Sequence, residues 1–187
     1  MEIDRANKRV RVKVLVTAEE SWIPYDKLVL ATGANPVIPP IPGVKRKNVF
    51  TLHGVHDAEG IRALLAHGKA RDVAIIGGGL IGVETTEALV AHGCRVTVVE
   101  MLPQILNMLD PEMARLVEKH MESKGVKIMT STRALSIEGP GEAEDAVTGV
   151  QTDKGRVSAD MVILAVGVDP GNEAPMRALA MRQARRR

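Results

Sequence analysis

The sequence predicts an α/β fold, with a parallel sheet that carries helices on its faces and an added antiparallel β meander. Two observations support this. Short apolar runs typical of buried strands, such as VAII at 73–76 and RVTVV at 95–99, alternate with segments of helical periodicity. From about residue 132 to 158, short strand-like segments separated by Gly-Pro-Gly and Asp-Lys-Gly replace that alternation, which is typical of a meander.

The first part of the chain predicts strands and then a stiff connector. Residues 8–17 alternate apolar and charged side chains as a half-buried strand does, with a turn expected at 19–21 and a second strand from Trp22. The apolar run 28–31 predicts a buried strand. Proline fixes φ and removes an N–H donor, so the four prolines of 35–44 predict an extended boundary segment.

The rest of the chain predicts helices that alternate with strands. Asp57 is the expected N-cap of a helix over about 58–67, and Asp110-Pro111 has the N-cap and N1 chemistry of another helix. The other expected elements are a helix over about 80–92, the end of the third helix at Gly125, and strands at 126–129 and 161–166.

The strongest functional signal is a strand–glycine–helix–strand–acid unit over 73–100. Gly77 permits the tight turn after the strand, Gly79 lets the backbone approach a pyrophosphate, and Gly82 lets the helix pack closely on the sheet. Glu100 ends the next strand, where its carboxylate can accept hydrogen bonds from both ribose hydroxyls. The unit predicts a Rossmann-like site for a dinucleotide.

The residues around Glu100 predict NAD(H) rather than NADP(H). The carboxylate would repel a 2′-phosphate, and Met101, Leu102 and Pro103 offer no cation to hold one. Two alternatives stay open: FAD, whose fingerprint is the same, and a glycine-rich turn that binds nothing.

Composition and charge exclude several classes of protein. Aromatic residues make up 2% of the 187 residues, too few for stacking platforms that hold single-stranded nucleic acid. No apolar run approaches the roughly 18 residues of a membrane span, and a single cysteine fits a cytoplasmic protein. The arginine-rich segment 176–187 could contact RNA or an anionic surface, but we expect a solvated terminus and no nucleic-acid partner.

Other chemistry-bearing residues have structural interpretations. His53 and His56 precede a helix beside Asp57, and we expect turn and capping roles rather than a metal site. His67 and His92 each precede a glycine at an expected helix end, where an imidazolium suits the helix dipole. The sequence therefore predicts no metal.

Four motifs carry a family resemblance, and they occur in the family's order. They are YDKLVLATGANPVIPPIPGV, VAIIGGGLIGVETTEAL, VTVVE and ADMVILAVGVDPGNE. Together they closely resemble the pyridine nucleotide–disulfide oxidoreductase superfamily, and most of all its NADH oxidases, NADH peroxidases and coenzyme A–disulfide reductases. The resemblance covers about residues 3–172.

The resemblance implies an FAD domain interrupted by an NAD domain, with a C-terminal domain that forms a homodimer. It implies hydride transfer from NADH to FAD, then to oxygen, peroxide or a disulfide. It places Glu84 near the nicotinamide, facing the flavin. The implied cofactor residues are Gly77, Gly78, Gly79, Leu80, Ile81, Gly82, Glu84, Glu100 and Gly167 for NAD, and Ala31, Thr32 and Gly33 on the FAD side.

The sequence also departs from the family pattern. We find no N-terminal FAD fingerprint, redox cysteine, second FAD segment or dimerisation domain, and expect a fragment. Cys94 follows the fingerprint helix, away from any flavin, so we expect a small buried residue and no catalytic residue in this chain apart from a role for Glu84. FAD is not expected to be retained.

The expected organisation is a partial FAD-binding domain at 1–43, an NAD-binding domain at 44–167 and a disordered tail at 168–187. Three hypotheses remain for the chain by itself. It is an NADH-binding module, a flavoenzyme complete only with further segments, or a truncated remnant without catalysis.

Overall fold

The structure is a computed structural model that describes residues 2–141 and 145–170. It separates into two compact units, Met1–Asn35 with Asp169–Arg187, and Pro36–Val168. Each unit is described by itself. The expected disordered tail lies, from residue 171 onward, outside the described residues.

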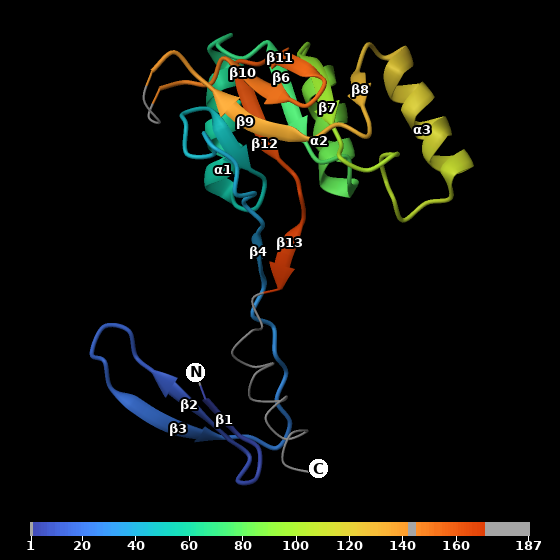
Figure 1. The fold of residues 1–187 in the computed structure, drawn as a ribbon. Helices are drawn as coiled ribbons and strands as arrows, with labels where there is room; N and C mark the ends of the chain where they lie inside the picture. The colour runs from blue at the N-terminus through green and yellow to red at the C-terminus, as the bar shows by residue number, and fades with distance from the viewer. Residues whose placement is uncertain (1, 142–144, 171–187) are drawn as a thin grey trace. The chain divides into compact units, whose positions relative to one another are not determined.

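The larger unit is built on a parallel five-stranded sheet (Figure 1). Its strand order is β5-β12-β6-β7-β8, so the two strands of the glycine unit, β6 and β7, are neighbours. Ile75 of β6 pairs with Val98 of β7 on one side and with Ile163 of β12 on the other. The strands are β5 (Val49–Thr51), β6 (Asp72–Ile76), β7 (Arg95–Val99), β8 (Lys127–Met129) and β12 (Met161–Leu164).

Within the described part of the chain, three helices cover one face of this sheet. They are α1 (Val55–Ala66), α2 (Leu80–Ala91) and α3 (Pro111–Ser123). Side chains alternate between the faces of a strand, and Val73 and Ile75 therefore share one core cluster with Ile61 of α1, Leu89 of α2 and Met121 of α3. The parallel sheet with helices packed on it was predicted correctly, and the structure adds that α1, α2 and α3 share one face.

The antiparallel meander covers the opposite face of the sheet. It consists of β9 (Ala134–Glu138), β10 (Gly149–Thr152) and β11 (Gly155–Ser158), in the order β11-β10-β9. Val150 and Val157 pack in a second core cluster with Ala74 and Ile76 of β6. The turns in the sequence predicted the meander, but they did not predict that it packs on the face of the sheet opposite the helices.

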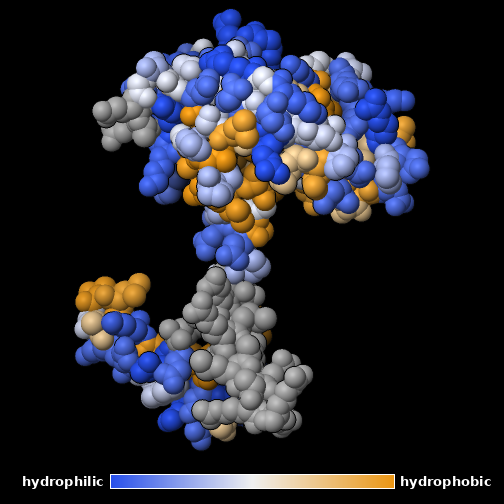
Figure 2. Space-filling model, in the orientation of Figure 1, coloured by the Kyte–Doolittle hydropathy of each residue, from blue (hydrophilic) through white to orange (hydrophobic). Residues whose placement is uncertain are grey.

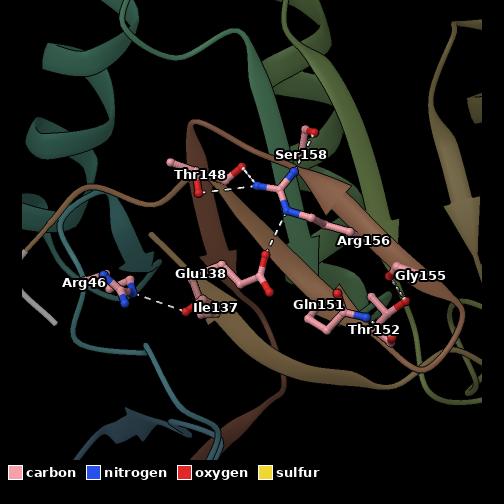
Figure 3. Close-up of polar contacts among 9 residues, drawn as sticks. All are labelled: Arg46, Ile137, Glu138, Thr148, Gln151, Thr152, Gly155, Arg156 and Ser158. Atoms are coloured by element: carbon pink, nitrogen blue, oxygen red, sulfur yellow. Dashed lines mark hydrogen bonds and ion pairs between the residues drawn. The ribbon is translucent and has the colours of Figure 1, made fainter. Parts of the chain in front are cut away.

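Figure 3 shows the polar contacts that fix the register of the meander. Arg156 donates from Nε to Glu138 Oε2 at 2.8 Å and from Nη2 to the carbonyl oxygen of Thr148 at 2.7 Å. Thr152 Oγ1 donates to the carbonyl oxygen of Gly155 at 2.6 Å and accepts from the backbone N–H of Lys154 at 3.1 Å. The Thr152 side chain therefore stabilises the turn between β10 and β11.

Helix α1 begins earlier than the sequence predicts. Its N-cap is Gly54, and Asp57 lies inside the first turn. Asp57 Oδ2 accepts from the backbone N–H groups of His53 and Gly54, at 2.9 and 3.3 Å, and from Thr51 Oγ1 at 3.1 Å. The prediction of Asp57 as N-cap was wrong, because its carboxylate bonds back to the preceding turn instead of standing in front of the helix.

These contacts predict a pH-dependent contribution of Asp57 to stability. Burial alone would raise the pKa of its carboxyl, but the hydrogen bonds from His53, Gly54 and Thr51 lower it overall. We expect Asp57→Asn to lower the free energy of unfolding by about 1 kcal/mol near pH 7. A lowered folded pKa gives stability that is complete above the unfolded value of about 4 and is lost as the pH falls through the folded pKa.

Urea unfolding followed by circular dichroism between pH 3 and 7 tests this prediction. The difference in the free energy of unfolding between wild type and Asp57→Asn should become smaller towards pH 3, because a protonated aspartate resembles asparagine. Glu87→Gln, on the exposed surface of α2, is the control for loss of a carboxylate. A difference that is the same at pH 3 and pH 7 would contradict the assigned role.

The smaller unit contains an antiparallel sheet of β1 (Glu2–Asp4), β2 (Arg9–Lys13) and β3 (Glu20–Pro24). The guanidinium of Arg9 lies 4.6 Å from the centroid of the Trp22 ring. The turn falls at 15–18 rather than at the predicted 19–21, because Val14 N–H bonds to the Glu19 carbonyl and Ala18 adopts a φ of +59°. Leu15 and Val16 therefore lie in the turn, exposed.

The predicted buried strand at 28–31 is wrong. These residues form no strand, and Val29 is 85% exposed. An apolar run becomes a buried strand only where neighbours accept its backbone hydrogen bonds, and among the described residues no strand pairs with it. Further along, β4 (Ala34–Pro36) and β13 (Val168–Pro170) pair as a two-stranded sheet, which the sequence did not predict.

Within residues 2–141 and 145–170, none of the helices combines the length and the apolar character needed to cross a bilayer.

Candidate functional site

The candidate site is the turn between β6 and α2, at the carboxyl edge of the parallel sheet. Gly77 has a φ of +110°, in the left-handed half of conformational space that favours glycine. A Cβ at this position would overlap the carbonyl oxygen of Ala165, which follows β12. The backbone N–H of Gly77 donates to the Val99 carbonyl at 2.9 Å. Glycine is therefore required where three neighbouring strands end together.

Gly82 has the packing role that the sequence predicts. It lies in the first turn of α2, and an added Cβ would overlap the carbonyl oxygen of Gly77 and lie 3.4 Å from Ile75 Cγ2. The helix can approach β6 this closely only because the side chain is absent. This contact holds the amino end of α2 close to the backbone of Gly77.

Gly79 differs from these two glycines because the space beside it is open. It is the N-cap of α2, with φ −76° and ψ −172°, and apart from its two chain neighbours no described residue has a heavy atom within 4 Å of an added Cβ. Among the residues that the structure describes, no side chain caps α2. The first N–H groups of a helix have no partner within the helix, and they form its positive dipole end. Open space and free donors at one point suit a diphosphate.

Glu100 lies beside this turn and is buried, with 8% of its surface exposed. Its Oε2 accepts from the backbone N–H of Gly78 at 2.6 Å, and its Oε1 accepts from the N–H of Leu102 at 2.7 Å. The prediction that this carboxylate accepts from both ribose hydroxyls did not include these bonds. Each carboxylate oxygen can accept a second hydrogen bond, so Glu100 can hold the glycine turn and a hydroxyl together.

The segment 105–106 packs against the glycine turn, and no local sequence pattern predicts this role. Leu106 donates its backbone N–H to the Gly78 carbonyl at 2.8 Å, and a Cβ on Gly78 would lie 2.7 Å from Ile105 Cγ2. Buried Glu118 of α3 accepts from Arg115 at 2.8 Å and from Ile105 N–H at 3.4 Å. This support comes from tertiary contacts alone.

Other predicted NAD residues surround the turn with more exposed side chains. Leu80 is 59% exposed at the start of α2, and Glu84 is exposed one turn later. Glu84 lines a surface cavity of about 530 Å³ between α1 and α2, together with Arg62 and Thr85. Ile81 is half-buried. The structure places Leu80, Ile81 and Glu84 on the first turns of α2, directly after Gly79, and their cofactor roles stay predictions.

Gly167 lies across the same edge of the sheet, after β12. It has a φ of +115° and accepts from the N–H of Val37 at 3.0 Å. Exposed apolar side chains follow the strand ends here, including Leu52 at 39% and Val166 at 38%. Figure 2 shows apolar surface at the lower end of the larger unit.

The residues predicted to lie on the FAD side belong to the smaller unit. Ala31, Thr32 and Gly33 are exposed, and Gly33 has a φ of +71°. Their predicted contact with a flavin stays a prediction.

Cys94, His67 and His92 have the structural positions expected from the sequence, but His56, expected before the helix, lies inside α1. Cys94 is buried, and burial, with a smaller contribution from the Asp72 carboxylate, raises the pKa of its thiol. His67 and His92 are the C-cap residues of α1 and α2. Among the described residues, no group of three or more His, Cys, Asp or Glu side chains could hold a metal ion.

Comparisons with known proteins agree with the resemblance. The chain is 37% identical over 179 residues to an NADH oxidase of Methanocaldococcus jannaschii, covering 95% of this chain and 39% of that protein. It is 40% identical over 174 residues to a CoA-dependent NAD(P)H sulfur oxidoreductase of Pyrococcus abyssi, covering 92% and 37%. The chain thus spans less than two fifths of the length of these relatives.

A solved structure has the same fold. The NAD-dependent persulfide reductase from A. fulgidus superimposes with a TM-score of 0.81 at 38% identity, covering 95% of this chain and 32% of that one. The family model described as pyridine nucleotide-disulphide oxidoreductase matches residues 1–186. The resemblance found in the four motifs is therefore confirmed, and the chain belongs to the pyridine nucleotide-disulphide oxidoreductase family.

Proposed function

We propose that this chain is the NAD(H)-binding portion of an FAD-dependent NADH oxidoreductase. The observation that carries the proposal is the open space beside Gly79, at the uncapped amino end of α2. The N–H groups there would bind the diphosphate of NADH, and Glu100 would accept from its adenosine ribose. Bound NADH supplies a hydride, and this chain holds and orients it.

The relatives support this function for the family. The names NADH oxidase and CoA-dependent NAD(P)H sulfur oxidoreductase describe the two relatives, both of which are much longer than this chain. We propose that the complete protein passes electrons from NADH through FAD to oxygen, peroxide or a disulfide. A homodimer and a cytoplasmic location belong to the same proposal, and a buried thiol suits a reducing compartment.

The site favours NADH over NADPH. Glu100 presents a buried carboxylate beside the expected ribose, and Met101, which follows it, is 62% exposed and apolar. A 2′-phosphate would meet a like charge with no cation from 101–103 to offset it. We expect NADH to bind at least about tenfold more tightly than NADPH.

Isothermal titration calorimetry of the purified chain with NADH and then with NADPH tests the proposal. Saturable 1:1 binding of NADH with weaker NADPH binding is the expected result. The visible absorption of the same sample distinguishes the module from a flavoenzyme, because a retained flavin would be yellow and would bleach on addition of NADH. A folded chain that binds neither nucleotide would refute the proposed function.

A further inference from the structure

The loop that follows Glu100 is joined to a second loop that lies far away in the sequence. The N–H of Thr132 donates to the Glu100 carbonyl at 2.9 Å, and the N–H of Ser131 donates to the Leu102 carbonyl at 2.8 Å. The loop after β8 therefore lies against the segment where a 2′-phosphate on the adenosine ribose would come. The sequence alone does not place these loops together.

The hairpin of β10 and β11 brings a cation to this pair of loops. Lys154, at the hairpin turn, donates from Nζ to the Thr130 carbonyl at 3.0 Å. Asp153, beside it, accepts the backbone N–H of Arg133 through Oδ1 at 2.9 Å, and its own N–H donates to the Arg133 carbonyl at 3.1 Å. These bonds tie the hairpin turn to the loop after β8.

The Lys154 ammonium group can donate further hydrogen bonds in this position. Its side chain is exposed, and an ammonium group has three N–H donors, of which the Thr130 carbonyl takes one. Glu100, by contrast, already accepts one backbone N–H on each oxygen, which offsets part of the repulsion that its charge exerts. With the Lys154 ammonium nearby and the Glu100 carboxylate hydrogen-bonded, this region repels a phosphate less strongly than residues 100–103 alone indicate.

We propose that Lys154 is a specificity-determining residue that gives this site its residual affinity for NADPH by pairing with the 2′-phosphate. The inference rests on the proposed function, since it needs the adenosine ribose at Glu100. NADH remains the preferred nucleotide, and Lys154 sets how large that preference is. The ligand class recognised by Lys154 is a ribose phosphate monoester.

Calorimetric titration of the full chain with NADH and NADPH, in wild type and Lys154→Met, tests the inference. The methionine keeps the length of the side chain and removes its charge. We expect NADPH affinity to fall about threefold to fivefold, as for an exposed ion pair, and NADH affinity to stay within about twofold. The effect should shrink between low and high salt, because exposed charges are screened.

Two further variants separate charge from folding. Lys154→Arg keeps the cation and should retain NADPH binding. Lys127→Met removes an exposed lysine at the start of β8, and should leave the ratio of the two affinities unchanged.

The outcomes separate the two proposals. If NADH does not bind to wild type, the proposed function fails. If NADH binds but the NADPH-to-NADH ratio is the same in wild type and Lys154→Met, the role of Lys154 is overturned and the proposed function stands. Wild type that binds NADH and shows no NADPH binding at millimolar concentration also overturns it.

Discussion

Gly79→Ala should weaken NADH binding at least about tenfold, or by about 1.4 kcal/mol of binding free energy, while the protein stays folded. The added methyl group would enter the open space in which the diphosphate is proposed to lie, and would hold it away from the N–H groups of α2. The backbone tolerates alanine at φ −76° and ψ −172°, since this is an extended conformation. Calorimetric titration with NADH measures the loss.

Gly54→Ala is the matched control for this variant. Gly54 is the N-cap of α1, with an extended backbone at φ −129° and ψ 175°, and nothing lies within 4 Å of its added Cβ. Replacing an N-cap glycine by alanine costs each helix a similar amount of stability, up to about 1 kcal/mol. Equal NADH affinity in the two variants would refute the placement of the diphosphate at Gly79.

Gly79 tests the site more cleanly than Glu100 does. The Glu100 carboxylate accepts the N–H groups of Gly78 and Leu102, so removing it would disturb the loop as well as any bond to ribose. Loss of binding in a Glu100 variant would therefore have two explanations. Apart from residue 79 and its two chain neighbours, no described residue has a heavy atom within 4 Å of the methyl carbon of Gly79→Ala, so a loss of binding in this variant has one explanation.

Gly77→Ala should cost the fold about 3 kcal/mol or more, or prevent it from forming. Two penalties combine there. The φ of +110° is strained for any residue with a Cβ, and that Cβ would overlap the carbonyl oxygen of Ala165. Backbone at a strand end cannot retreat as a flexible side chain would. Urea unfolding followed by circular dichroism measures the loss, together with the yield of soluble protein.

Gly93→Ala separates strain from overlap. Gly93 follows α2 with a φ of +80°, but nothing lies within 4 Å of its added Cβ. Only the conformational penalty applies, and we expect a loss of about 1 kcal/mol. If the two variants lose the same free energy of unfolding, the overlap with the Ala165 carbonyl at the end of β12 does not add to the cost of Gly77→Ala, contrary to this prediction.

Local sequence identified the buried strands of the parallel sheet whose neighbours lie within the described residues, but not the short pair of β4 and β13. The apolar runs that became β6 and β7 were recognisable, because a strand buried on both faces needs apolar residues throughout. The run at 28–31 has the same character and formed no strand. The two runs differ because β6 and β7 have neighbouring strands that accept their backbone hydrogen bonds. The amino-acid composition of a segment does not show whether such a neighbour exists.

The sequence by itself determined the parallel sheet, the meander, the glycine turn and the acid after β7, since short-range periodicity and side-chain size express these features directly. Only the tertiary structure decided that the helices share one face, that Glu100 holds the N–H groups of Gly78 and Leu102, and that Lys154 reaches the loop after β8. Each of these depends on segments distant along the chain, which meet only when apolar side chains are buried together and backbone groups must find partners.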